Sequence, residues 1–506
     1  VVDANGNIVC APGAVNSPIA TLSSTCSPIN PFGQQISQAA SDYVTTIARP
    51  VSINTQKVLT ATVAGDVIDL PGGKIGISAG YEHREEKATF DPGAFFFGEV
   101  DSADPTGPRG QFGRSIPIDP VSGKFKTDEV FGEVRIPIVD SDMNVPLVYS
   151  LEVQGAVRYV HNSIAGNATT WTAGGQYRPI QDITLRGNYT RSIRAPAITE
   201  LFAPTGLIFD TADDPCDARF LDAGPDPARR RANCAADGLP PDFQSLIVDR
   251  TVQESLSGNP NLENETAKSW TIGAVIRPSF VRGFAASVDW VNISLSKAIL
   301  SLDDDQLLEA CYDAANFPSE ACSQIDRDPD GQIDFIRTGY VNAASYKYKG
   351  LIGQIDYQMP TPFLGSSSTV AWGVNYQYID QLEQRVGTGD LTTLRSSIGY
   401  SKHKATVNLT YHNEAFTWQW QALYYGPAKF DPDELPDTRD YPGVSSVTFF
   451  NTTVALDVND RFGLRFIVDN VFDKAPPFPS PGGGGSITYF RGLLGRYFKV
   501  GANVKF

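Results

Sequence analysis

Hydrophobic and polar residues alternate in segment after segment along this chain. In residues 498–506, for example, Phe, Val or Ala occupies every even position, and Lys, Gly or Asn occupies every odd one. Successive side chains of a β-strand point to opposite faces, so this alternation predicts a strand with one apolar face and one polar face. The same pattern predicts strands at about 56–68, 73–90, 124–138, 147–159, 166–178, 182–193, 266–278, 284–297, 333–342, 345–359, 367–382, 404–411, 416–424, 450–458, 462–468 and 498–506.

Most of these roughly sixteen strands approach or exceed the ~10 residues that a strand needs to cross a bilayer at a tilt. Strands of soluble proteins average about half that length. Their polar faces carry Glu, Arg, Gln and Asn, which suit a hydrated lumen better than a dry core. The sequence therefore predicts an all-β fold, a transmembrane antiparallel β-barrel whose apolar face meets lipid. The alternative is a soluble secreted all-β protein, in which that face meets a second sheet.

Connections between the strands are short in some places and long in others. Tight turns are predicted at 165–167, 178–183, 277–283, 413–415 and 457–461. Long loops are predicted at about 1–55, 91–123, 194–265, 298–332, 383–401, 425–444 and 472–494, with a short helix inside one of them at 303–315. Short turns at one end and long extracellular loops at the other are typical of outer-membrane barrels. We therefore interpret 1–506 as a single, partial barrel domain.

Composition supports strands and excludes some functions. The chain has 2 Met but 45 Gly, 20 Tyr and 28 Phe, which favours strands, turns and aromatic girdles over helical cores. A net charge of -16 argues against a nucleic-acid partner, because phosphates need a basic surface. No nucleophile motif, paired-carboxylate signature or phosphate-binding loop is present, so we do not expect an enzyme.

The six cysteines form three pairs that are close in the sequence and bracket loop-like stretches. The pairs are Cys10 with Cys26, Cys216 with Cys234, and Cys311 with Cys322. Local pairing in loops predicts three disulfides and an oxidising compartment. Six reduced thiols or a metal site are the alternatives, although neither Cys-x-x-Cys spacing nor a nearby His supports a metal.

One acidic stretch has the spacing of calcium ligands. In residues 326–334, Asp326, Asp328, Asp330 and Asp334 occupy positions 1, 3, 5 and 9 of an EF-hand loop, and Gly331 occupies position 6. Position 12, where a bidentate Glu is needed, is Arg337, and the flanks resemble strands. An ordinary acidic loop is therefore the favoured interpretation, and a calcium ion is the alternative. No other cofactor is expected.

Three motifs resemble those of the TonB-dependent outer-membrane receptors. Residues 191–202 read RSIRAPAITELF and are similar to the family's Arg-Ala-Pro and Glu-Leu-Phe segment, through Arg194, Pro196, Glu200 and Phe202. Residues 258–267 read GNPNLENETA and resemble its Gly-Asn-Pro strand entry, through Asn259, Pro260 and Glu265, with Asn264 in place of the usual Pro. Residues 469–474 read DNVFDK and contain the matching Asn470, while Phe506 matches the family's terminal aromatic residue.

The resemblance implies a barrel of about 22 strands that is occluded by an N-terminal plug. It also implies import of a scarce nutrient with energy delivered by the inner-membrane TonB complex through that plug. The plug and the first strands are not recognisable in these residues. We therefore expect a complementary N-terminal chain or segment to carry them, because unpaired backbone in lipid costs several kcal/mol per group.

The predicted function is thus the barrel part of a TonB-dependent transporter in the bacterial outer membrane, with its loops extracellular and lipid around its wall. Nutrient binding is expected at the lumen and at aromatic residues of the long loops, which are Phe95, Phe96, Phe97, Phe202, Phe209, Tyr424, Tyr425, Phe430 and Tyr441. The alternative is a structural barrel that anchors a partner protein at the surface.

Overall fold

A computed structural model of the chain describes residues 2, 4–6, 8–9, 27–29, 36–45, 47–98, 100, 109–110, 117–387, 391–434, 440–477 and 492–505. The predicted pairing of Cys10 with Cys26 and the terminal Phe506 fall outside these residues. None of the described helices is long and apolar enough to cross a membrane.

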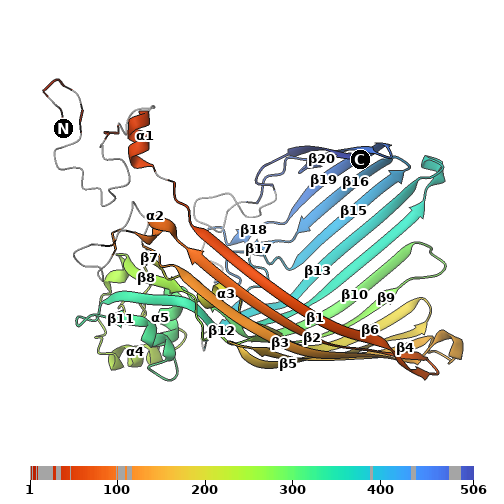
Figure 1. Ribbon diagram of the computed structural model, residues 1–506, viewed down its shortest axis with the longest axis horizontal. Helices are drawn as coiled ribbons and strands as arrows, with labels where there is room; N and C mark the ends of the chain where they lie inside the picture. Colours follow the sequence, from red (N-terminus) through yellow and green to blue (C-terminus); the bar gives the residue numbers. More distant parts are fainter. Residues whose placement is uncertain are drawn as a thin grey trace.

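One large antiparallel sheet dominates the described part of the chain, and it curves as the wall of a barrel does (Figure 1). Each strand of the wall is hydrogen-bonded to the next in this order: β1 (Val51–Leu70), β2 (Gly73–Asp91), β3 (Val121–Val139), β4 (Ser150–Asn162), β5 (Gly166–Ile180), β6 (Ile183–Arg194), β9 (Glu265–Ile276), β10 (Phe284–Ser301), β12 (Ile333–Pro360), β13 (Thr369–Val386), β15 (His403–Asn413), β16 (Phe416–Tyr425), β19 (Val447–Asn459), β20 (Phe462–Asp469) and β21 (Tyr497–Val504). The predicted all-β barrel fold is confirmed.

The wall has fifteen strands where about sixteen were predicted, because the segments 333–342 and 345–359 form one strand. Residues 343 and 344 contain no turn-forming residue, and Ala344 pairs with Ala298 of β10, so β12 continues through them. It is 28 residues long and extends beyond the wall.

The register confirms that the wall is two-faced. Directly paired residues of neighbouring antiparallel strands lie on the same face. One row across β13, β15, β16 and β19 consists of Val374, Val407, Ala422 and Phe450. The adjacent row on the other face contains Asn408, Gln421 and Asn451, which are linked by hydrogen bonds of 3.0 and 3.1 Å. The apolar rows suit lipid and the amide rows suit a hydrated lumen.

The predicted turn at 165–167 is short, but it lies at the long-loop end of the wall. The backbone N–H of Ser163 donates to the carbonyl of Lys126 at 2.9 Å. Lys126 lies near the start of β3, where the long connection from β2 ends. Consecutive strands alternate in direction, so the β4–β5 turn must join the two strands at this end. The assumption that every short turn belongs to the opposite end was wrong here.

Further short elements lie before β1 and in the connections between the strands of the wall. Helices are α1 (Gln38–Val44), α2 (Gly93–Phe97), α3 (Ile198–Phe202), α4 (Pro227–Ala236) and α5 (Asp304–Tyr312), and short 3-10 turns span Ser141–Met143, Leu246–Val248, Glu320–Gln324 and Pro362–Leu364. Short strands are β7 (Gly206–Asp210), β8 (Val252–Ser257), β11 (Ile325–Arg327), β14 (Leu391–Thr393), β17 (Ala428–Lys429) and β18 (Gly443–Val444). The helix predicted at 303–315 is therefore confirmed as α5.

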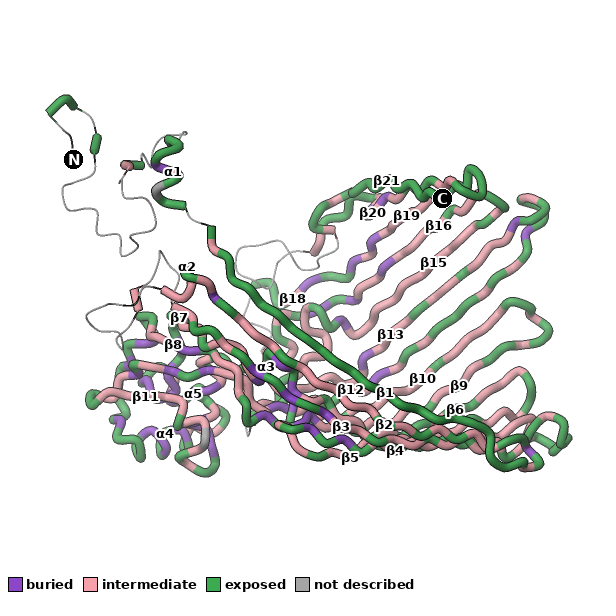
Figure 2. Tube along the Cα trace, viewed as in Figure 1, coloured by how far each residue is buried: buried purple, intermediate pink, exposed green. Residues whose placement is uncertain are grey.

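Residues 206–258 and 303–339 form a small folded unit beside the end of the wall, which we call the knob (Figure 1). In it β7, β8, the first residues of β12, and β11 pair side by side, and α4 and α5 pack nearby. Buried residues are concentrated there (Figure 2), and they include Leu308 and Ile336. The knob therefore has a hydrophobic core of its own, unlike a plain loop.

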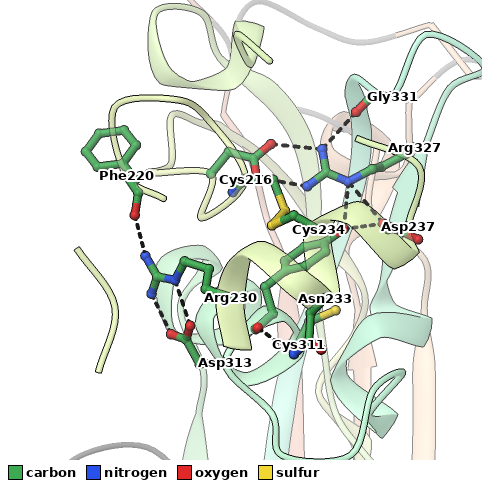
Figure 3. Close-up of a disulfide and its surroundings, with 12 residues drawn as sticks. Cys216, Phe220, Arg230, Asn233, Cys234, Asp237, Cys311, Asp313, Arg327 and Gly331 are labelled. Atoms are coloured by element: carbon green, nitrogen blue, oxygen red, sulfur yellow. Dashed lines mark hydrogen bonds and ion pairs between the residues drawn. A yellow bond between two sulfur atoms is a disulfide. The ribbon is translucent and has the colours of Figure 1, made fainter. Parts of the chain in front are cut away.

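Two of the predicted disulfides are present, and both lie in the knob. Cys216 is bonded to Cys234, and Cys311 is bonded to Cys322. Around the first of these bonds, Arg230 and Arg327 point to buried acidic and carbonyl groups (Figure 3). Cross-links and buried ion pairs together compensate for the small size of this core.

Candidate functional site

Helix α3 is fastened to the mouth of the barrel wall by Arg194, the last residue of β6. Arg194 Nη1 donates to Glu200 Oε2 at 2.9 Å, and its Nε donates to Glu265 Oε2 at 2.7 Å. Glu200 Oε2 also accepts the backbone N–H of Ala197 at 2.7 Å, and Glu265 Oε1 accepts that of Ile299 at 2.8 Å. One guanidinium thus joins β6, α3 and β9.

The apolar side of α3 packs on the inner surface of the wall. Leu201 is buried with Phe125 of β3 and with Leu262. Phe202 lies directly on Gly123 of β3, where an added Cβ would meet its ring at 2.1 Å. Phe125 and Glu129 lie four residues apart in β3 and therefore on the same face, which is the face toward the lumen. Helix α3 thus turns inward across the barrel mouth.

The remaining motif residues also hold backbone in place. The Asn259 side chain donates to the carbonyl of Tyr340 at 2.9 Å, next to Pro260. Asn264, which stands where the family has Pro, donates to the carbonyl of Ala165 at 3.0 Å and so ties the β4–β5 turn to this end. Asn470 has φ 51° and bonds with both the N–H and the carbonyl of Lys474, each at 2.9 Å.

A cleft of about 660 Å³ lies on the wall beside the end of β6. Its lining includes the lumen-facing side chains Arg84, Glu86, Phe125, Thr127, Glu129, Phe131, Glu133, Arg158, Thr172 and Arg194. Strands β2 to β6 supply these side chains in register. The sheet therefore forms most of the cleft, and residues 195–197 of the connection between β6 and α3 complete it.

Charges in the cleft are largely paired with one another. Arg158 donates to Glu129 at 2.6 Å, and its guanidinium carbon lies 4.6 Å from the ring centre of Phe131. Arg84 donates through Nη2 to Glu82 at 2.9 Å, whereas its buried Nε has no hydrogen-bond partner within the described residues. The cleft can therefore offer the aromatic face of Phe131 and paired charges to a polar ligand or protein segment.

Sequence reasoning did not single out Arg84, Glu129, Phe131 or Arg158. Each lies in a predicted strand, on its polar face or next to polar neighbours, but only the register reveals that they converge. Arg194 and Glu200 were identified through their motif. The structure places Arg194 at the edge of the same cleft, with Glu200 as its hydrogen-bond partner.

The predicted calcium-binding residues are mostly engaged elsewhere. Asp326 is paired with Arg337, which donates from Nη1 at 2.8 Å and holds the pKa of Asp326 below its ordinary value. Asp328 accepts the backbone N–H groups of Asp330 and Gln332, each at 2.9 Å. Across the described residues, no three His, Cys, Asp or Glu side chains form a ready set of metal ligands. Calcium binding at residues 326–334 therefore remains a prediction.

A curved two-faced sheet with a polar, charge-paired inner surface and a helix across its mouth defines the wall of an outer-membrane receptor barrel. The match to a family model agrees with this class. The chain belongs to the TonB dependent receptor-like, beta-barrel family, whose model matches residues 25–471. The family implies an outer-membrane location.

Solved structures with the same fold are receptors of this family. The ferric enterobactin receptor PfeA from Pseudomonas aeruginosa, solved with enterobactin, matches with a TM-score of 0.56 and 16% identity over 90% of this chain and 54% of its own. The siderophore receptor PirA from Pseudomonas aeruginosa matches with a TM-score of 0.50 and 14% identity, over 90% of this chain and 57% of its own. The hemophore receptor HasR from Serratia marcescens, solved with HasA and heme, matches with a TM-score of 0.50 and 14% identity, over 91% and 60%.

The chain thus spans little more than half the length of the first of these receptors. No curated protein matches it in sequence.

Proposed function

We propose that this chain forms most of the wall of a TonB-dependent transporter, which binds a nutrient at its loops and lumen for energised import. The observation that carries the proposal is the inner surface of the wall. Rows of amides and paired charges line it over many strands, and the opposite rows are apolar. This division suits a lipid-embedded barrel with a hydrated interior.

Closure of the barrel requires strands beyond those described. Within the described residues, β1 pairs only with β2, and β21 pairs only with β20. Each free edge would leave a row of unpaired N–H and C=O groups in lipid, at several kcal/mol per group. A complementary N-terminal chain or segment therefore completes the barrel and supplies the plug. TonB acts through that plug, and the long loops face outward.

The cleft beside β6 is a contact site for the plug or for the nutrient. Strands β2 to β6 line it with polar and aromatic side chains, and Arg158 is paired with Glu129 beside the ring of Phe131. Ligands named in the related structures, enterobactin and heme, are the first candidates for the nutrient. Carbohydrates and peptides are the second group, because aromatic loop residues also stack on such ligands.

Uptake by cells that produce the native assembly tests this proposal. Radiolabelled ferric enterobactin, heme, an oligosaccharide and a peptide are offered with and without an uncoupler of the proton motive force. Accumulation of one ligand that stops with the uncoupler is the expected result. Binding and accumulation of none of them, together with a stoichiometric protein partner on the loops, would favour the anchoring role instead.

A further inference from the structure

The buried carboxylates of the knob are paired with arginines, with one exception. Asp214 accepts two hydrogen bonds from Arg327, both at 2.8 Å. Asp313 accepts two from Arg230, one of them from Nε at 2.6 Å. Asp217 accepts two from Arg219, at 2.8 and 2.9 Å. Each negative charge taken out of water here is compensated by a guanidinium, as burial of a charge demands.

Glu254 of β8 is the exception. Its side chain is 2% exposed, and it points to the core side of the small sheet, in the same row as Ile208 and Ile336. Within the described residues no Arg or Lys pairs with it. Its Oε1 is buried and meets no hydrogen-bond donor.

The group opposite Glu254 is a second carboxylate, that of Asp304 in the first turn of α5. The two side chains lie within hydrogen-bonding reach of each other. Asp304 Oδ1 accepts the backbone N–H of Asp305 at 3.0 Å, but its Oδ2 is buried and has no donor either. Each of these two neighbouring side chains therefore has one buried oxygen without a donor.

Two ionised carboxylates cannot remain in this arrangement alone, because like charges repel strongly out of water. Either a proton or a cation must lie between them. Burial, then Asp304, and then Asp210 and Asp305 raise the pKa of Glu254 to about 8. One proton neutralises only one of the two carboxylates, and within the described residues no guanidinium pairs with the other as in the rest of the knob, while Asp210 and Asp305 are exposed to solvent.

We propose that a calcium ion binds between Glu254 and Asp304 and joins β8 to the start of α5. Both buried oxygens without a donor here belong to carboxylates, and hard oxygen ligands are those that calcium prefers. Asp210 and Asp305 add negative charge from the end of β7 and from α5. Since the side chains alone do not form a full ligand set, backbone carbonyls and water complete the six to eight oxygens that calcium takes.

This site is distinct from the acidic stretch at 326–334, where Asp326 already has Arg337 as its partner. It also differs in what it holds together. The ion would connect the strand pair β7–β8 with α5, and its two ligands Glu254 and Asp304 lie fifty residues apart in the sequence. Calcium would then stabilise the knob, and the rest of the barrel would not need it.

Calcium titration of the native assembly after treatment with EDTA tests the proposal. Isothermal titration calorimetry at pH 7 is expected to show one site per chain, and Glu254→Gln is expected to weaken it at least tenfold. Asp328→Asn is the matched control, because it removes one carboxylate from the other acidic stretch, and it should leave the affinity unchanged. Peptide mapping of Cys216–Cys234 and Cys311–Cys322 verifies that each variant is folded.

Two results would overturn the proposal. One is the absence of a calcium site in the folded wild-type assembly. The other is a site that Glu254→Gln leaves intact and Asp328→Asn removes. If calcium does not bind but the knob loses thermal stability between pH 7 and pH 9, a shared proton holds the pair, and the calcium assignment is wrong.

Discussion

A charge placed on the apolar face of the wall should cost far more than the same charge one residue away. Val407 lies in the fifth position of β15 and pairs with Val374 and Ala422 in an apolar row. Four residues at about 3.3 Å each, with a tilt of about 40°, place it about 10 Å deep. That depth is near the middle of an apolar band about 25 Å tall, where Arg costs about 2–4 kcal/mol.

Val407→Arg is therefore expected to lower the free energy of unfolding of the native assembly by about 2–4 kcal/mol. Thr406→Arg, on the same strand but facing the lumen, is the matched control and should cost less than about 1 kcal/mol. Urea unfolding in phospholipid vesicles, followed by tryptophan fluorescence, measures both. Equal losses for the two variants, or a larger loss for Thr406→Arg, would show that the assignment of the two faces is wrong.

Three further predictions concern α3 and the knob. Gly123→Ala places a Cβ at 2.1 Å from the ring of Phe202, so it should lower the free energy of unfolding by about 1–3 kcal/mol and speed amide exchange in α3. Adding Phe202→Ala should restore most of the lost stability. If it restores none, the contact between the two residues is refuted. Arg230→Met leaves Asp313 buried without its partner and should destabilise the knob by about 3–5 kcal/mol. Arg231→Met breaks an exposed pair and should cost less than about 1 kcal/mol. Thermal unfolding measures both. Hydrogen bonds from the Arg219 side chain and then from backbone N–H groups hold the pKa of Asp217 below its ordinary value. The stability that this carboxylate provides is therefore present above about pH 4 and is lost as the pH falls through the folded pKa. An acid unfolding curve of Asp217→Asn that matched the wild type would refute this.

Strand alternation was sufficient to predict the wall and its two faces, because the period of two is a local property of the chain. Even the merger of two predicted strands into β12 has a local explanation in Ala343 and Ala344. The motif residues Arg194 and Glu200 were also found from sequence. Glu265, the second partner of Arg194, was identified in a separate motif, and only the structure joins the three.

The cleft and the knob were not predictable in the same way. Arg158 and Glu129 lie 29 residues apart, and their meeting depends on the register between β3 and β4. The exceptional position of Glu254 depends on a parallel pairing of β8 with β12 and on the placement of α5. Such contacts between distant segments leave no periodic signal, so the acidic stretch at 326–334 was more visible in the sequence than the buried pair.

The central claim is that this wall closes with strands supplied by a complementary segment. Cryo-electron microscopy of the native assembly in a lipid environment tests it most directly. We expect β1 and β21 each to be hydrogen-bonded, on the edge that is free here, to strands outside β1–β21, with a plug inside the closed barrel. A barrel in which β1 pairs directly with β21, or an assembly that stays soluble without detergent or lipid, would contradict the claim.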